Sequence, residues 1–221
     1  MKKQILAIGG ACLMTALAVL PCGPPHEVVI PQTVLEIPQA LPAEHDKSKA
    51  AIESITRYNP SITDGEAENL WRIVRDTVAR FRADPAYSGG AVEKITPELV
   101  LSVILVESSA RSRAHSKAGA MGLMQIVPVH HIDSLHSAGI LSTKDKNELW
   151  NAERNVMAGT YILMCYAMSS ESIAEALARY NAGRRIAAGM PYARKVLGLH
   201  DRIFGQSHKR SVVYDTGQKS G

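Results

Sequence analysis

Aromatic side chains and net charge are both scarce in this sequence. Phe81 and Phe204 are its only phenylalanines, and Phe, Trp and Tyr together make up 5% of the 221 residues. A buried core must therefore come mainly from Leu, Ile, Val, Ala and Met. The formal net charge of +4 is compatible with an anionic polymer as partner, but a secreted protein without such a partner can carry the same charge. Charge alone therefore identifies no partner. We do not expect a nucleic acid as partner.

The sequence also lacks a run of residues long and apolar enough to predict a membrane-spanning helix. The most apolar stretch, residues 1–20, is short and broken by glycine, and it follows two lysines. Its small residues near Ala18 fit the cleavage site of a secretory signal, so we expect a signal peptide over residues 1–18. A lipoprotein signal using Cys22 is the alternative, but Pro21 immediately before that cysteine disfavours it.

Cysteine is rare, with three residues in the chain. Cleavage after Ala18 would leave Cys22 and Cys165, which could pair in an oxidising compartment. Cys165 lies in a strongly helical stretch, which favours a buried free thiol instead. Both interpretations stay open at this point.

Strand-like alternation is absent, and helical periodicity dominates after a proline-rich start. Residues 19–46 contain six prolines and no helical period, which predicts an extended arm. Residues 64–83 repeat apolar side chains at helical spacing, with charged residues opposite. Further helices are expected over 96–109, from Leu123 to an interruption at Pro128, over 151–168, over 172–183 and from Pro191 to Leu197; residues 129–150 are expected to be looser.

Glu107 stands apart from the other acidic residues. It ends an apolar run, and the next acidic residue downstream is Asp133. A rotation of ~100° per residue places Glu107 on the same helix face as apolar positions 99, 100, 103 and 104. Such neighbours raise the pKa of a carboxyl group, which suits a general acid at neutral pH. The alternative is a helix-end glutamate that reaches solvent or pairs with a nearby arginine, and position alone leaves both open.

Two other polar residues lie within apolar patterns. Gln125 falls inside the run Leu123-Met124-x-Ile126, where its amide needs a hydrogen-bonding partner. Tyr180 shares a face with apolar residues, so its hydroxyl also needs a partner if buried. Either residue fits a core position or the border of a cleft.

Three motifs in order resemble those of the Slt-type lytic transglycosylases, relatives of goose-type lysozyme. They are Glu107-Ser108, GAMGLMQ at 119–125 and YNAG at 180–183, and RNVMAGTYIL at 154–163 resembles the segment between the last two. The resemblance covers residues from about 96 to 200. It implies a mainly α, lysozyme-like domain that acts on peptidoglycan glycan strands in the periplasm without a cofactor.

The resemblance implies a reaction that uses no water. Glu107 would protonate the glycosidic oxygen between N-acetylmuramic acid and N-acetylglucosamine. The same carboxylate would then accept a proton from the muramic C6 hydroxyl, which closes a 1,6-anhydro ring. Residues 108–132 contain no second acid, whereas usual glycosidases need two carboxylates.

The resemblance also implies supporting roles around the catalytic carboxyl group. Ser116 and Gln125 would make hydrogen bonds around that group and the N-acetyl group of the substrate. Tyr180 would help to hold the carboxyl group, and Asn181 would line the cleft. Met124 is expected among the substrate-binding residues.

Several positions depart from the pattern of the family. Ala110 stands where an aromatic residue is usual, Arg111-Ser112 stands where Asn-Pro is common, and Val127 replaces a frequent methionine. Residues 182–200 contain no acid, although many members carry a Glu-Thr pair there. Compact members that serve secretion or conjugation machines often lack this pair too, which makes such a machine a second expected partner by analogy.

The resulting organisation is a monomer of five segments. We expect a signal peptide (1–18), a proline-rich arm (19–46), a helical segment that packs on the catalytic domain (47–90), a lytic transglycosylase domain (91–205) and a mobile tail (206–221). His130, His131 and His136 are expected to be exposed loop residues, because no Cys or acid lies at metal-ligand spacing, and we expect no metal.

Two other functions compete with the transglycosylase. A muramidase would deliver water instead of the C6 hydroxyl. A non-catalytic assembly factor or wall-binding module would keep the fold without turnover.

Overall fold

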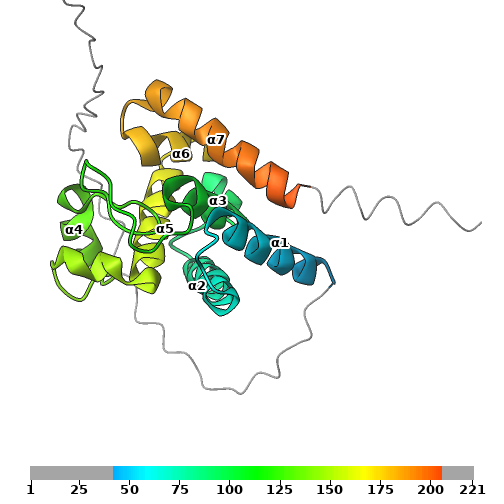
Figure 1. Ribbon diagram of the computed structural model, residues 1–221. Coiled ribbons are helices and arrows are strands. Elements are labelled where there is room, and N and C mark those ends of the chain that lie inside the picture. Colours follow the sequence, from blue (N-terminus) through cyan, green and yellow to red (C-terminus); the bar gives the residue numbers. More distant parts are fainter. Residues whose placement is uncertain (1–41, 206–221) are drawn as a thin grey trace, which may run out of the picture.

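The computed structural model describes residues 42–205, which form an almost entirely helical domain (Figure 1). The expected signal peptide, most of the expected arm and the expected tail lie outside these residues. No strand forms within residues 42–205, so the prediction of a mainly α fold is confirmed. The elements are α1 (Pro42–Tyr58), α2 (Asp64–Ala83), the 3₁₀-helix η1 (Gly90–Lys94), α3 (Pro97–Ser108), α4 (Pro128–Ser137), the 3₁₀-helix η2 (Lys146–Trp150), α5 (Ala152–Met168), α6 (Ile173–Ala182) and α7 (Ile186–Phe204).

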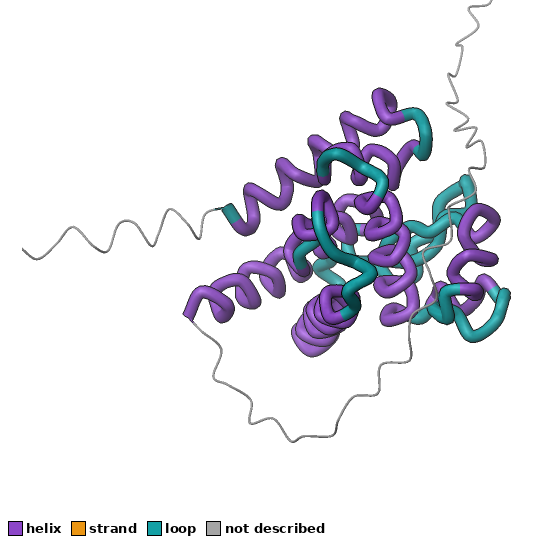
Figure 2. Tube along the Cα trace, turned by 180° about the vertical axis from the view of Figure 1, so that it is seen from behind, coloured by secondary structure: helices purple, strands orange, loops and turns teal. Residues whose placement is uncertain are grey.

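Helix α3 lies at the centre of the domain. Figure 1 shows α1 and α2 on one side of α3 and α5, and α6 and α7 on the other. Seen from behind, α4 and much of the loop structure gather at one edge (Figure 2). Helix α3 is buried on nearly all sides, through residues 98–105 and 108. A helix that is apolar all round belongs in a core. The structure therefore extends the single apolar face expected for this helix to nearly its whole circumference.

Side chains cap the helices where the sequence predicts helix starts. Thr96 accepts a hydrogen bond from the Leu99 backbone N–H at 3.2 Å, and Pro97 takes the first helical position. Thr63 and Glu66 form a reciprocal capping box at the start of α2. The predicted helices over 64–83, 96–109 and 151–168 are thereby confirmed to within a residue or two.

Helix α1 begins earlier than expected, at Pro42 rather than near Lys47. Proline is tolerated at the first position of a helix, because the N–H it lacks has no helical partner there. The Trp71 indole N–H donates to Ser48 Oγ at 3.0 Å, and Lys47 pairs with Glu98 at 3.0 Å. These contacts hold α1 against α2 and α3.

The apolar helix expected from Leu123 does not form. Residues 119–127 instead make a tight loop with antiparallel bridges between His115 and Met121 and between Met121 and Ile126. Gly122 and Gln125 have φ angles of 77° and 48°, which a right-handed helix cannot accommodate. Pro128 then begins α4, so the prediction of a looser chain after residue 129 is wrong over this helix.

The last helix is longer than expected. Helix α7 starts at Ile186 and runs through Pro191, whereas a start at Pro191 was expected. Its packing on α6 is close, since a Cβ on Gly189 would lie 2.1 Å from the Ala178 carbonyl oxygen. Burial of this interface compensates for the hydrogen bond that a proline removes. None of the helices between residues 42 and 205 has the length and apolarity that a membrane span requires.

Candidate active site

Glu107 lies in the last turn of α3 and is half-buried. Burial raises the pKa of its carboxyl group to about 7. The nearby Tyr192 hydroxyl and the positive charge of Lys195 both act in the opposite direction, and burial outweighs them. At neutral pH the carboxyl group is therefore present in both protonation states, which suits a group that must donate and then accept a proton.

The chain turns sharply just after Glu107. Ser109 and Ala110 have φ angles of 53° and 58°, so α3 ends in two consecutive left-handed residues. Such a conformation is unfavourable for residues other than glycine and occurs at functional sites. It directs the chain away from the end of α3 and leaves Glu107 beside α7.

Tyr192 on α7 is the tyrosine that contacts Glu107. Its hydroxyl lies beside the carboxyl group and lowers the carboxyl pKa, and it is buried without any partner at full hydrogen-bonding geometry. Burial and the nearby carboxyl group raise the pKa of Tyr192 well above its usual range, so the hydroxyl keeps its proton. We did not predict Tyr192 or Lys195 as site residues: the helix expected from Pro191 to Leu197 contains both, but its packing against the end of α3 was not predicted. Their spacing of three within the helix was the available signal.

Tyr180 lies near Glu107 but donates its hydrogen bond elsewhere. Its hydroxyl donates to the Met124 carbonyl oxygen at 2.8 Å. Burial and the Glu107 charge raise the Tyr180 pKa well above its usual range. Tyr180 therefore ties α6 to the 119–127 loop, and any hold on Glu107 is indirect.

Gln125 finds its partners inside the same loop. Its Nε2 donates to the Ala114 and Gly122 carbonyl oxygens at 3.1 and 3.0 Å. Ser116 closes a neighbouring turn, where its Oγ accepts from the Ala120 N–H at 3.0 Å. Both side chains therefore stabilise the conformation of the loop.

The remaining predicted binding residues differ in exposure. Asn181 is exposed at the end of α6, where it can reach a ligand. Met124 is fully buried, and its side chain packs against α5 at Gly159. This contradicts a direct substrate contact by the Met124 side chain: the backbone of the loop points its carbonyl toward Tyr180 while the thioether fills the core.

Asn155 on α5 anchors the loop from below and was not predicted. Its Oδ1 accepts from the Met124 N–H at 2.8 Å, and its Nδ2 donates to the Met121 and Leu149 carbonyl oxygens at 3.0 and 2.9 Å. The side chain is 1% exposed, so these bonds form away from water. An asparagine within an apolar helix was the signal in the sequence.

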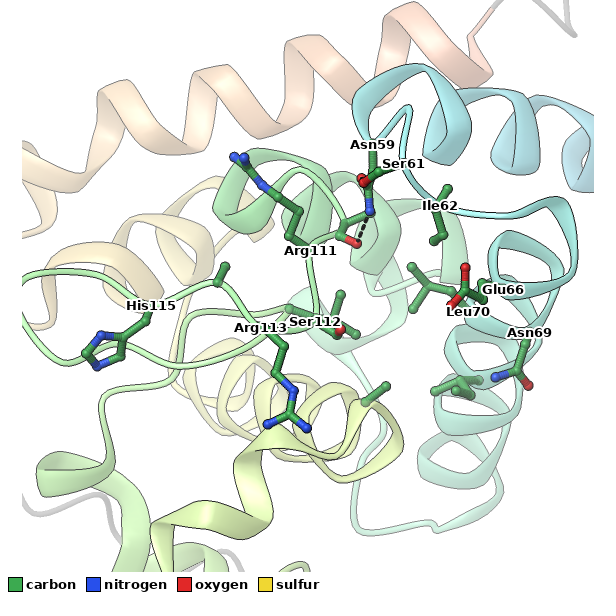
Figure 3. A pocket seen from close by; sticks show the side chains of 15 residues that line it. Asn59, Ser61, Ile62, Glu66, Asn69, Leu70, Arg111, Ser112, Arg113 and His115 are labelled. Carbon is green, nitrogen blue, oxygen red and sulfur yellow. Dashed lines mark hydrogen bonds between the residues drawn. The ribbon is translucent and has the colours of Figure 1, made fainter.

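A cavity of about 830 Å³ lies beside the loop that follows α3 (Figure 3). Residues 59–73 line one side of it and residues 110–115 line the other. Glu107 does not line this cavity, although its loop wall starts three residues after Glu107.

The three clustered histidines do not form a metal site. Within residues 42–205, no group of three His, Cys, Asp or Glu side chains is arranged to hold a metal ion. The histidines lie on α4 rather than in a loop; His136 is exposed as expected, whereas His130 and His131 are half-buried, which corrects their expected exposure. Burial lowers the pKa of His131 to about 4, so it is neutral at pH 7.

The free-thiol and disulfide alternatives are not resolved by the described residues. Cys165 is half-buried on α5, and Cys22 lies outside residues 42–205.

Comparison with known proteins identifies a family that the chain resembles. Residues 86–189 match the Transglycosylase SLT domain family. Two relatives, each an Endo-type membrane-bound lytic murein transglycosylase A from a strain of Klebsiella pneumoniae, are 35% identical over 75 residues. The matched region is 34% of this chain and 37% of each relative, so the chain spans little more than a third of the length of the curated relatives it matches. The resemblance to the Slt-type family is confirmed.

Proposed function

We propose that this chain, which carries a transglycosylase SLT domain over residues 86–189, is a peptidoglycan lytic transglycosylase that uses Glu107 as acid and then base. The observation that carries the proposal is a single half-buried carboxyl group beside Tyr192 and Lys195, whose pKa burial raises to about 7. No other carboxylate of the described residues perturbs it.

In the first step, protonated Glu107 donates its proton to the glycosidic oxygen. The bond between C1 of N-acetylmuramic acid and that oxygen breaks, and N-acetylglucosamine leaves with the proton. Glu107 becomes a carboxylate, which the Tyr192 hydroxyl and the Lys195 ammonium group stabilise.

In the second step, the Glu107 carboxylate accepts the proton of the muramic C6 hydroxyl. The C6 oxygen bonds to C1 and closes the 1,6-anhydro ring, which regenerates protonated Glu107 without consuming water. A pKa near neutrality serves both steps, because neither proton transfer is then strongly uphill. Asn181 and Gln125 have supporting roles in holding the substrate. Gln125 acts through its Oε1, because its amide nitrogen already donates to backbone carbonyl groups.

A muramidase would need a group that activates water. An inverting enzyme separates its two carboxylates by roughly 6.5–9.5 Å, and a retaining enzyme by roughly 5–5.5 Å. No acidic residue occurs at 108–132 or 182–200, the two segments that follow α3 and α6. This absence favours the intramolecular hydroxyl over water as the nucleophile.

Digestion of purified sacculi tests the proposal. We expect mass spectrometry to find muropeptides lighter than hydrolysis products by one water, and active digests without them would identify a hydrolase instead. The Glu107→Gln variant should lose activity and keep its helical circular dichroism. Equal activity in that variant would remove Glu107 from the mechanism, and an inactive wild type that still binds sacculi would favour the wall-binding module. The lengths of released strands would also tell internal cleavage, which the names of the relatives describe, from cleavage at ends.

We further propose that the protein acts in the periplasm as a monomer, after export directed by residues 1–18. The support is the signal-like composition of that segment, which lies outside the described residues. A cell-envelope secretion or conjugation machine as partner rests on analogy with compact members of the family. Fractionation of cells that produce the full chain, followed by sizing of the purified protein, tests location and oligomeric state.

A further inference from the structure

The cavity between α2 and the 110–115 loop has no role in the reaction described above. Apolar and polar side chains share its lining. The apolar residues are Ile62, Leu70, Ile73, Ala110, Ala114, Leu123 and Ala152. Cavities with an apolar interior and a few polar groups at defined places are the usual form of ligand sites.

Two arginines give the loop side of this cavity its positive charge. Figure 3 shows Arg111 and Arg113 on that side, with their guanidinium groups pointing in opposite directions. Arg111 Nε donates to the Ser108 carbonyl oxygen at 3.1 Å, and the Arg113 guanidinium lies over the Trp150 ring at 5.7 Å. Within residues 42–205 neither arginine forms an ion pair, whereas Arg72, Arg154 and Arg179 each have a carboxylate partner.

Glu66 is the one carboxylate among the lining residues, and it lies on α2, on the opposite side of the cavity from the arginine-bearing loop (Figure 3). Its Oε2 accepts hydrogen bonds from the Thr63 N–H and the Thr63 hydroxyl, both at 2.8 Å. These bonds lower the pKa of Glu66, so it stays ionised as the cap of α2. Two arginines against one engaged carboxylate leave the cavity with excess positive charge.

The arginines are connected to the catalytic end of α3. Arg111 follows Glu107 by four residues, and its bond to Ser108 fixes the loop to the last turn of the helix. A glycan strand positioned with its scissile bond at Glu107 can therefore bring a neighbouring substituent to the cavity.

We propose that this cavity binds a peptide stem of the peptidoglycan strand, with Arg111 and Arg113 as ligands of its carboxylates. The inference rests on the proposed function and deepens it. The N-acetylated sugars of the strand are neutral, whereas the stems carry carboxylates and small apolar side chains. Guanidinium groups pair with carboxylates through two parallel hydrogen bonds, and two separated guanidinium groups suit a peptide with more than one carboxylate. The apolar lining residues fit the methyl groups of alanine residues.

Binding to a catalytically inactive protein tests this proposal without relying on turnover. Isothermal titration calorimetry would compare a disaccharide tetrapeptide with the same disaccharide whose lactyl group carries a neutral methylamide in place of the peptide, each titrated into Glu107→Gln protein. We expect the peptide-bearing ligand to bind more tightly and to weaken as salt is added. Adding Arg111→Gln and Arg113→Gln should weaken that ligand about tenfold or more, the scale expected for lost charge-assisted hydrogen bonds, and leave the peptide-free ligand unchanged.

Arg75→Gln is the matched control, since Arg75 is exposed on α2 and does not line the cavity. It should leave both affinities unchanged. The proposal is overturned if the two loop substitutions weaken both ligands equally, because the arginines would then serve the sugar site or the fold, and also if they weaken neither ligand. Failure of the proposed function would look different: wild-type protein would release no anhydro product from sacculi, while peptide-dependent binding through the arginines persisted.

Discussion

Replacing Glu107, the proposed catalytic acid, should stabilise the protein, and only at high pH. Burial raises the pKa of Glu107 from 4.5 to about 7 in the folded state, whereas the unfolded chain has the ordinary value. Below the ordinary value both states hold the proton, so the carboxyl group costs nothing. As pH rises toward the folded pKa, the unfolded state loses its proton first and the folded state is disfavoured. At ~1.4 kcal/mol per pKa unit, the full difference is at most about 3 kcal/mol.

Urea unfolding of wild type and Glu107→Gln, followed by circular dichroism, measures this cost. Glutamine does not titrate, so the free energy of unfolding of the variant relative to wild type should rise by up to about 3 kcal/mol between pH 4 and pH 9. For a domain of this size the gain corresponds to roughly 6–12 °C in melting temperature. Other titrating groups are common to both proteins and cancel. Glu68→Gln, at an exposed position of α2, is the matched control.

A difference between Glu107→Gln and wild type that is flat with pH would refute the reasoning. The carboxyl group would then be solvated as an ordinary helix-end glutamate, and a different explanation of its chemistry would be required. A gain of the expected sign would identify Glu107 as a group that is destabilising in its charged form and retained despite that cost.

Three further predictions concern the Tyr192 contact, the anchoring of the 119–127 loop and the packing of α7 on α6. Tyr192→Phe removes the hydroxyl that lowers the Glu107 pKa, so the fall of kcat/KM at alkaline pH should move up by about one unit, and an unmoved limb would exclude this contact. Asn155→Ala leaves three backbone groups of the loop and of η2 unpaired; it should cost about 2–4 kcal/mol in urea unfolding and reduce activity, and a neutral result would contradict its anchoring role. Gly189→Ala forces a methyl group against the Ala178 carbonyl, so we expect a loss of about 1–3 kcal/mol, measurable as a lower melting temperature, with exposed Gly198→Ala as a neutral or stabilising control.

The positions at which sequence reasoning succeeded are those controlled by local chemistry. The cap at Thr96, the proline that follows it and the apolar run to Ser108 predict α3 without any tertiary information. Reasoning failed where long-range packing decides the outcome. Helix α7 extends through Pro191 because it is packed on α6. Hydrogen bonds with Asn155 keep the 119–127 segment in a loop instead of a helix.

The sequence alone determined a helical domain with one isolated acid, because helix periodicity, caps and the lack of a second carboxylate are all readable from residue order. It also indicated the family, through three short motifs. Only the tertiary structure decided how the acid is tuned. Tyr192 and Lys195 lie on α7, far along the chain from Glu107, and the desolvation that raises the Glu107 pKa exists only when α3 and α7 pack together. Packing likewise sent the Met124 side chain into the core while its carbonyl met Tyr180. Burial and cross-helix contacts are properties of the folded chain, so no local pattern encodes them.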